Sequence, residues 1–385
     1  MKVIPRAIAK FFTDADILIL GLSMFSIIFG LIIINSIVRN MPGNMVTVQI
    51  VSVVIGLGLF ILFSYVDIDI IADKSAFLMI FSVLLISSLV IWGTGDYETG
   101  NNAWIRFEAG FGIQPAEIVK IPYIIILAKM LSSFKERKTI NNFLSLLQIV
   151  AVCGIVVGLI LVVSDDMGSA LVYVFIVLVM MFVGGVKLRW FLLAGAVVAA
   201  VFPFLWNFLE PFQQARILAP YARFFPDLLS QADYERFTWQ VNISINAIAS
   251  GGLTGLGLGN GAVTQSPGRL FAHHTDFIFA AIAEELGFLG ALLAIVLLVL
   301  VIVRCVYVGT KSNNSLGMLV CTGISAMLIF HVIINVGMSL GVMPVIGISL
   351  PFFSYGGSAI VTCLAAMGIV SGIKMRPKTT RFRSL

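Results

Sequence analysis

Charged residues are scarce in this sequence. Only 11% of the 385 residues are Asp, Glu, Lys or Arg, whereas 59% are hydrophobic and the mean hydropathy is +1.06. A soluble domain carries about 25% charged residues, so the chain has too few charges to cover a surface that faces water. The same scarcity excludes a disordered chain, which needs low hydrophobicity and high net charge. The composition predicts a protein that is solvated by lipid.

Cysteine and histidine are also few. The four cysteines lie far apart, and the sequence contains neither a CxxC motif nor a zinc-type Cys/His spacing. Three histidines are too few for a histidine-rich metal centre. The net charge of +5 is not clustered enough to follow a nucleic-acid backbone. We therefore expect no disulfide framework, no zinc site and no nucleic-acid partner.

Long, continuous apolar runs fill most of the chain. A helix needs roughly 20 apolar residues to cross the hydrocarbon core of a membrane. We expect spans near Ile17–Ile37, Thr47–Tyr65, Ser75–Gly93, Ala116–Leu131, Phe143–Val163, Gly168–Val186, Trp190–Leu209, Phe277–Val303, Leu316–Leu340 and Phe352–Ile373. The runs lack the alternating polarity of a β-barrel. The sequence therefore predicts an all-α polytopic membrane protein with about ten transmembrane helices, forming a single domain over residues 1–385.

Basic residues orient these spans. Lys2, Arg6 and Lys10 precede the first span, which is expected to remain as an anchor. With the N-terminus in the cytoplasm, most of the 24 Lys and Arg residues fall in cytoplasmic segments, as the positive-inside rule requires. Both termini are then cytoplasmic. One long connection, residues 210–275, lies on the outer face between the seventh and eighth spans, and loops of this length are usually functional.

Ionisable residues within or beside the spans are candidate functional groups, because burying a charge in lipid is costly. Glu117 and Lys120 are three residues apart and share one helix face. They form either a neutralised pair that fixes helix packing or a site where Lys120 meets an anionic substrate. Asp166 follows Asp165 in a short turn, where it caps a helix or helps to hold a divalent cation.

A second group of carboxylates surrounds the start of the eighth span. Asp276 stands where the long connection enters this span, either as a helix cap or as a reactive group. Glu284 and Glu285 follow about two turns deeper, and unpaired burial of such groups costs several kcal/mol. The carboxylates at this entrance are therefore the densest candidate site in the sequence.

Two segments rich in small residues accompany these carboxylates. The run from Gly251 to Gly261 fits no nucleotide-binding motif, because it has no Walker lysine and no preceding strand. It is better interpreted as backbone packed closely on a ligand or on a neighbouring helix. Ser354, Gly356 and Gly357 precede the last span, where they permit close helix contact or line a headgroup cavity. Before the glycine run, Gln240, Asn242, Ser244 and Asn246 alternate with apolar residues; they line a groove or form one face of a surface helix.

Together these segments resemble the SEDS (shape, elongation, division and sporulation) family of bacterial cell-wall polymerases over nearly the whole chain. The matching motifs are Asn102-Ala103-Trp104-Ile105-Arg106 with Gln114-Pro115-Ala116-Glu117 and Lys120, Asp166-Met167-Gly168-Ser169-Ala170, Ser250-Gly251-Gly252-Leu253 with His274-Thr275-Asp276-Phe277 and Glu284-Glu285, and Pro344-Val345-Ile346-Gly347 with Ser354-Tyr355-Gly356-Gly357-Ser358. Asn335-Val336-Gly337-Met338 and the short tails look closer to the RodA-like elongation branch. Asn102-Ala103, Ser164-Asp165 and Phe271-Ala272-His273 depart from the usual family residues.

The resemblance implies a peptidoglycan glycosyltransferase that polymerises lipid II at the outer face of the bacterial cytoplasmic membrane. A sugar hydroxyl needs a carboxylate to take its proton, and the family match assigns this role to Asp276. Lys120, Arg106, Arg216 or Arg223, or a divalent cation (Mg²⁺ or Mn²⁺) held by Asp166 and Asp276, would stabilise the pyrophosphate. The other expected substrate-binding residues are Trp104, Glu117, Asp166, Gln240, Ser244, Glu284, Glu285, Ser354, Gly356 and Gly357.

The resemblance also implies partners, namely a class B penicillin-binding protein with one membrane span and other proteins of an elongation complex. Three alternatives remain open from the sequence. A flippase or transporter would need a polar path across both leaflets, whereas the charged residues of interest gather in the outer half. A non-catalytic scaffold would not need Asp276. A division or sporulation polymerase of the same family would share the same motifs.

Overall fold

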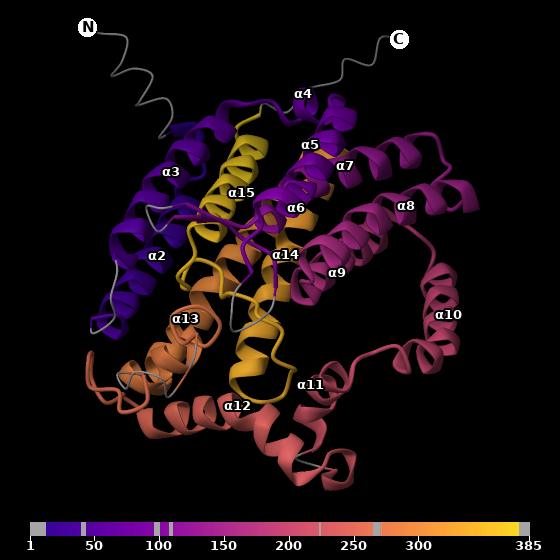
Figure 1. The fold of residues 1–385 in the computed structure, drawn as a ribbon. Helices are drawn as coiled ribbons and strands as arrows, with labels where there is room; N and C mark the ends of the chain where they lie inside the picture. Colours follow the sequence, from indigo (N-terminus) through magenta and orange to yellow (C-terminus); the bar gives the residue numbers. More distant parts are fainter. Residues whose placement is uncertain are drawn as a thin grey trace, which may run out of the picture.

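The computed structural model describes residues 13–39, 44–95, 101–107, 111–222, 225–264, 270 and 272–376. Within these ranges the chain is almost entirely helical and contains one antiparallel two-stranded hairpin (Figure 1). The helices are α2 (Ile17–Ile37), α3 (Met45–Tyr65), α4 (Ile68–Asp73), α5 (Ser75–Ser87), α6 (Leu89–Trp92), α7 (Pro115–Glu136), α8 (Phe143–Leu159), α9 (Met167–Gly184), α10 (Leu188–Trp206), α11 (Pro211–Ala222), α12 (Gln231–Gly251), α13 (Ile278–Thr310), α14 (Ser315–Ser339) and α15 (Gly357–Met375). The remaining elements are the π-helix η1 (Ile160–Ser164), the 3-10 helix η2 (Pro226–Leu228) and strands β1 (Ile105–Arg106) and β2 (Gly112–Ile113).

Eight helical stretches of the described residues are long and apolar enough to cross a membrane. They correspond to eight of the ten predicted spans and confirm the polytopic all-α class. The fourth predicted span is α7, which is more polar because it carries Glu117, Lys120 and Lys129. The seventh is α10, whose apolar stretch, Leu188–Phe204, is shorter than the others.

The predicted boundaries of two spans were wrong, one at its beginning and one at its end. The last span begins at Gly357 rather than Phe352, because residues 340–356 form a non-helical segment, called here the 340–356 loop. Its Leu350 and Phe353 are at most 1% exposed, so they pack inside the protein and not against lipid. The eighth span, α13, extends to Thr310 and is interrupted at Gly287, whose φ of 68° is outside the helical region.

The core of the bundle is built around α14 and α15. α15 packs along α3, and α14 lies between α7, α9 and α13 (Figure 1). Gly368 of α15 allows the close approach to α3, because a Cβ atom there would lie 2.6 Å from the Phe60 carbonyl oxygen. Small residues of this kind let membrane helices pack backbone to backbone. Residues far apart in sequence are thereby brought into one buried layer.

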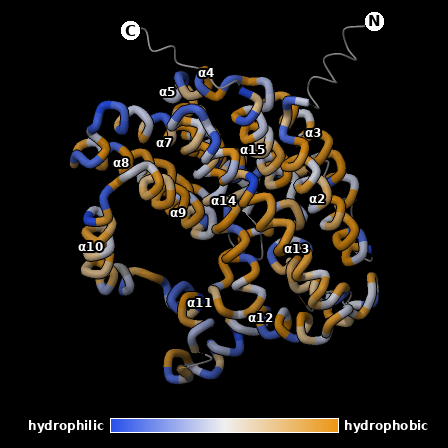
Figure 2. The backbone as a smooth tube through the Cα atoms, turned by 180° about the vertical axis from the view of Figure 1, so that it is seen from behind, coloured by the Kyte–Doolittle hydropathy of each residue, from blue (hydrophilic) through white to orange (hydrophobic). Residues whose placement is uncertain are grey.

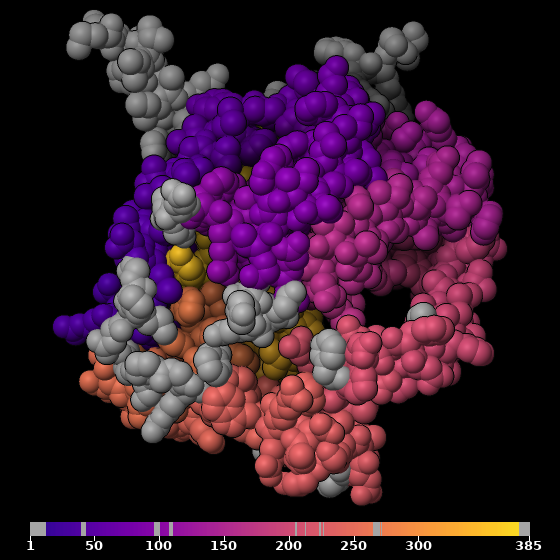
Figure 3. Space-filling model, in the orientation of Figure 1, coloured from indigo at the N-terminus to yellow at the C-terminus, as the bar shows by residue number. Residues whose placement is uncertain are grey.

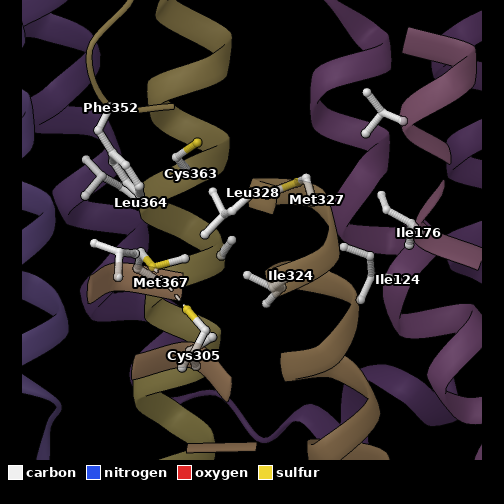
Figure 4. Close-up of a cluster of buried hydrophobic side chains, with 14 of the residues drawn as sticks. Ile124, Ile176, Cys305, Ile324, Met327, Leu328, Phe352, Cys363, Leu364 and Met367 are labelled. Carbon is white, nitrogen blue, oxygen red and sulfur yellow. Dashed lines mark hydrogen bonds between the residues drawn. The ribbon is translucent and has the colours of Figure 1, made fainter. Parts of the chain in front are cut away.

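Apolar side chains fill the space between these helices and also cover the outside of the bundle. Figure 4 shows Ile124 of α7, Ile176 of α9, Ile324 of α14 and Cys363 of α15 within one buried cluster. Most helices of the bundle are rich in hydrophobic residues along their length (Figure 2), and many of these residues are exposed, such as Val162 of η1 at 86%. Exposed apolar side chains on a spanning helix are what a lipid-solvated surface requires.

The segment 210–275, expected as a long loop, contains α11, η2 and α12. It lies at the end of the bundle opposite α4 and forms the lower layer of the space-filling view (Figures 1 and 3). α12 packs against α13 and α14. Because α12 is a helix, the alternating polar residues before the glycine run do not share one face: Ser244 is buried, whereas Asn242 and Asn246 are exposed.

Candidate active site

Asp276 sits at the entrance to α13, and other segments hold its backbone in place. Asn335 of α14 donates its side-chain amide to the Asp276 carbonyl oxygen at 2.8 Å. Ser354 of the 340–356 loop donates its hydroxyl to the carbonyl oxygen of the preceding residue, Thr275, at 2.6 Å. The Tyr355 N–H donates to the His274 carbonyl oxygen at 2.8 Å. α14 and the 340–356 loop therefore fix the position of Asp276 together.

The pKa of the Asp276 carboxyl is shifted toward the range in which a group can accept a proton in catalysis. Part of the residue is accessible, but protein atoms surround the carboxyl group. This burial raises the pKa of Asp276 to about 6, and the negative charge of Asp166 adds to the rise while a hydrogen bond with Thr275 opposes it. The neighbouring His274 does not compensate, because burial lowers the pKa of His274 to about 4 and leaves it neutral. A base with a pKa near the working pH is suited to general base catalysis.

Asp166 is the helix cap that one interpretation of its turn predicted. Its carboxylate accepts hydrogen bonds from the Ser169 N–H at 2.9 Å, from the Ser169 hydroxyl at 2.6 Å and from Gln114 Nε2 at 3.0 Å. It is 6% exposed and still acts electrostatically on Asp276. The structure therefore brings Asp166, Gln114 and Asp276 into one neighbourhood.

These carboxylates were also the expected ligands of a divalent cation. Among the described residues, no group of three or more His, Cys, Asp or Glu side chains is arranged to hold a metal ion. Mg²⁺ is commonly held by one or two carboxylates together with waters and substrate phosphates. Asp166 and Asp276 are two carboxylates close enough to interact electrostatically, and two is the number that such a site uses.

Glu117 and Lys120 form the expected ion pair, deep in the protein. Lys120 is 1% exposed and donates to Glu117 Oε1. A third member, His331 of α14, joins them, with His331 Nε2 2.9 Å from Lys120 Nζ and His331 Nδ1 3.0 Å from the Ser349 carbonyl oxygen. The sequence analysis missed His331. The signal was a single histidine inside an apolar run, four residues before Asn335 and so on the same helix face.

Ser354, Gly356 and Gly357 organise the 340–356 loop and its junction with α15. Gln49 of α3 donates to the Ser354 carbonyl oxygen at 3.0 Å and accepts from the Gly356 N–H at 3.1 Å. A Cβ atom at Gly357 would lie 2.8 Å from Ser52 Oγ of α3. The close-contact interpretation of these small residues is therefore confirmed, and through Ser354 they also support Asp276.

Trp104 and Arg106 belong to the hairpin that precedes α7. Arg106 is exposed and pairs with Gly112 across the hairpin, and the Trp104 carbonyl oxygen accepts from the Thr94 N–H at 2.8 Å. Ser358 of α15 donates to the Gly112 carbonyl oxygen at 3.1 Å and accepts from the Gln114 N–H at 3.0 Å. The hairpin is thus anchored beside the residue that contacts Asp166.

Glu284 and Glu285 accept hydrogen bonds from the backbone of residues 259–264. Glu284 is fully buried and accepts from the Val263 and Thr264 N–H groups at 2.8 and 2.9 Å. Glu285 accepts from the Gly259 N–H at 3.2 Å and from the Ser36 hydroxyl at 2.9 Å. Both carboxylates hold the glycine-rich segment.

The glycine run packs against α13, as one interpretation of the sequence expected. At Gly255, whose φ is +83°, a Cβ atom would lie 2.1 Å from the Glu285 carbonyl oxygen. Only glycine adopts this conformation without strain at such a distance. The run therefore serves as a closely packed backbone segment.

The remaining expected residues fall in segment 210–275. Ser244 of α12 donates its hydroxyl to the Ser339 carbonyl oxygen of α14 at 2.9 Å, and Gln240 lies one turn earlier on α12, partly buried. Arg216 lines an open groove with about 430 Å³ of empty space between α11, α12 and residues 341–345. Arg223 lies outside the described residues.

The arrangement is that of a polytopic helical membrane protein with a tuned carboxylate at one end of the bundle. A family model described as "Cell cycle protein", which groups FtsW, RodA and SpoVE, matches residues 11–379. The chain belongs to this family. It is 33% identical to stage V sporulation protein E of Bacillus subtilis, over 83% of this chain and 84% of the relative.

Other members are similar to comparable degrees. The probable peptidoglycan glycosyltransferase FtsW of Bacillus subtilis is 34% identical, over 85% of this chain and 80% of its own. The peptidoglycan glycosyltransferase MrdB of Escherichia coli K12 is 30% identical over 78% of each chain. Because these identities span only 30–34%, they do not separate the branches of the family.

Two solved structures share the fold. A chain of a peptidoglycan synthase complex, in a study of how polymerization and crosslinking are coordinated, superposes with a TM-score of 0.78 at 28% identity, covering 94% of this chain and 97% of that chain. The rod shape determining protein RodA of Thermus thermophilus superposes with a TM-score of 0.66 at 25% identity, covering 94% and 96%. The similarity extends over nearly the whole chain.

Proposed function

We propose that this protein is a peptidoglycan glycosyltransferase that polymerises lipid II into glycan strands at the outer face of the bacterial cytoplasmic membrane. The observation that carries the proposal is the Asp276 carboxyl, whose raised pKa of about 6 and fixed backbone suit it to accept a proton. The relatives named peptidoglycan glycosyltransferase support the reaction class.

In this reaction the sugar 4-hydroxyl of one substrate attacks the anomeric carbon of another, and a lipid pyrophosphate leaves. A hydroxyl is a weak nucleophile, so its proton must be taken as the bond forms. Asp276 is the base in this proposal, and burial together with the charge of Asp166 keeps the pKa of Asp276 raised. Gln114 and Ser169 hold Asp166 through three hydrogen bonds and so maintain that influence.

The departing pyrophosphate needs positive charge beside it. Arg106 is exposed on the hairpin, whereas Lys120 is 1% exposed. We therefore assign direct contact with the pyrophosphate to Arg106, and an organising role to Lys120. A divalent cation, held by Asp166 and Asp276, would supply further charge stabilisation when bound.

The orientation and partners follow the same proposal. The start of α2 and the end of α15 meet, since Lys374 Nζ donates to the Ala15 carbonyl oxygen at 3.2 Å, and this end of the bundle is assigned to the cytoplasm. A class B penicillin-binding protein is the proposed partner, supported by the fold shared with a chain of a peptidoglycan synthase complex. The elongation branch is favoured by Asn335-Val336-Gly337-Met338.

The test is polymerisation of labelled lipid II by the purified full-length protein, with and without the transpeptidase. We expect glycan polymer from the wild type and none from Asp276→Asn. Transfer of lipid II across vesicle membranes without polymer would instead favour a flippase. Complementation of an elongation mutant but not of a division mutant would support the branch assignment.

A further inference from the structure

Three polar residues form a buried ladder on one face of α14. His331, Asn335 and Ser339 are spaced by four residues, so they lie one above another on the helix. Each is at most 6% exposed, in a span whose other buried residues are mostly apolar. Polar groups in such a place are expected to have specific partners, and each of the three has one.

The ladder joins separate parts of the molecule. His331 contacts Lys120 of α7 and the Ser349 carbonyl oxygen of the 340–356 loop. Asn335 donates to the Ile348 and Asp276 carbonyl oxygens, both at 2.8 Å. Asn335 therefore holds the entrance of α13, while His331 holds the same loop one residue further along.

The contacts define the state of the His331 ring. The Lys120 ammonium has donors only, so the nitrogen 2.9 Å from it must present a lone pair. His331 Nε2 is then the acceptor and Nδ1 carries the proton, which it donates to the Ser349 carbonyl oxygen at 3.0 Å. This tautomer makes His331 a two-sided link, with the buried Glu117–Lys120 pair on one side and the loop on the other.

We infer that His331 is a positioning residue of the active site: its neutral, Nδ1-protonated ring couples the Glu117–Lys120 pair to the 340–356 loop that fixes Asp276. The titratable groups around the link are Glu117 and Lys120 of α7, with Tyr173 of α9 and Cys363 of α15 close enough to interact electrostatically with this pair. The role deepens the proposed function, because it acts through Asp276 and does not itself touch substrate.

The first experiment determines the tautomer of the His331 ring and does not depend on enzymatic activity. The chain has only three histidines, so ¹⁵N-histidine NMR of the full-length protein in nanodiscs gives three ring systems, and His331→Gln identifies the third. We expect the Nδ1–H tautomer, with the Nε2 signal shifting when Lys120→Met removes its donor. An Nε2–H tautomer, or an Nε2 signal that Lys120→Met leaves unchanged, would overturn the inference.

The second experiment measures lipid II polymerisation. His331→Leu removes both links and should lower kcat by about tenfold or more, the equivalent of losing a hydrogen bond to a charged group, while KM changes little. His331→Gln places a side-chain amide, which has one acceptor and one donor group, where the imidazole ring was. It should therefore recover most of the kcat that His331→Leu loses. Ser325→Ala is the control, because Ser325 is equally buried on α14 and donates only within its helix, to the Cys321 carbonyl oxygen.

The two experiments separate the possible failures. If the wild type makes no polymer and Asp276→Asn changes nothing, the proposed function fails, and the NMR result alone judges the His331 link. If the wild type polymerises and His331→Leu keeps full kcat, the positioning role is wrong. Equal losses in His331→Leu and Ser325→Ala would show a general packing effect and would also overturn the inference.

Discussion

Asp276 and Glu284 lie eight residues apart, just before α13 and within its first turns, and their carboxyl groups have different hydrogen-bond partners. Glu284 accepts two backbone N–H groups from the glycine-rich segment and is fully buried. Asp276 receives its strongest support on its backbone, from Asn335, while its carboxyl is raised in pKa by burial and by Asp166. Both oxygens of the Glu284 carboxylate accept hydrogen bonds from the backbone, whereas the Asp276 carboxyl has one side-chain hydrogen bond, with Thr275, and is held mainly through its main chain.

The largest expected effect comes from removing the Asp276 carboxylate. Asp276→Asn should lower the polymerisation rate by about 10²–10⁴-fold, the usual contribution of a general base, with no loss of thermal stability. Asp165→Asn is the matched control, since Asp165 is exposed with a φ of 50° that asparagine adopts readily. Normal polymer yield from Asp276→Asn would show that Asp276 is not the base, and that its role does not differ from that of Glu284 in this respect.

Glu117 tests a third situation, a carboxylate paired with a buried cation. Glu117→Gln and Lys120→Met should each destabilise the protein by about 3–5 kcal/mol, because each leaves an uncompensated buried charge. The double variant should regain much of this stability but not the activity, since the link to His331 stays broken. Thermal unfolding in detergent and polymer yield measure the two outcomes, and a fully active double variant would make the pair purely structural.

Glu284→Gln should reveal the structural role by losing stability and not chemistry. A glutamine carries one acceptor oxygen where the carboxylate uses two, so about 1–3 kcal/mol should be lost. The rate per folded molecule should stay near that of the wild type. Glu235→Gln on the exposed side of α12 serves as the control. A large fall in the polymerisation rate with an unchanged unfolding temperature would show that Glu284 takes part in the reaction.

The smallest expected effect is on the pH profile. Asp276 must be deprotonated to act as a base, and its pKa is raised to about 6. kcat/KM should therefore be constant above pH 7 and fall about tenfold per unit well below pH 6. Rates measured between pH 5 and pH 8, at pH values where unfolding is unaffected, check this. A flat profile down to pH 5 would mean an ordinary carboxyl pKa.

Much of the fold follows from the sequence because continuous apolar length alone selects a membrane span. The prediction for Ile17–Ile37 matches α2 at both ends. The same signal failed at Phe352, since apolar residues that pack inside the 340–356 loop look like residues that face lipid. It also gave no sign of α11, which lies outside the apolar runs, and α12 was expected only as the surface-helix interpretation of residues 240–246.

Contacts of the site between residues close in sequence could be predicted, whereas contacts between residues distant in sequence could not. Spacing of three was enough to pair Glu117 with Lys120. The contact of Lys120 with His331 joins residues 211 positions apart, and no local pattern specifies it. Glu284 and Glu285 were expected to bind substrate. The backbone N–H groups that they accept from belong to residues 259–264, and no local sequence pattern specifies these contacts.

The pairing of α3 with α15 has a consequence for how the protein is made. α3 is synthesised about 300 residues before α15, the helix that it packs against. Ser354 and Gly356, which Gln49 of α3 bonds, are also synthesised about 300 residues later. During translation α3 therefore resides in the bilayer without its partner, supported by its own hydropathy of 2.5. The bundle can close only after the last span has entered the membrane, so a chain that ends before α15 would leave Gln49 without the Ser354 and Gly356 backbone groups that it bonds.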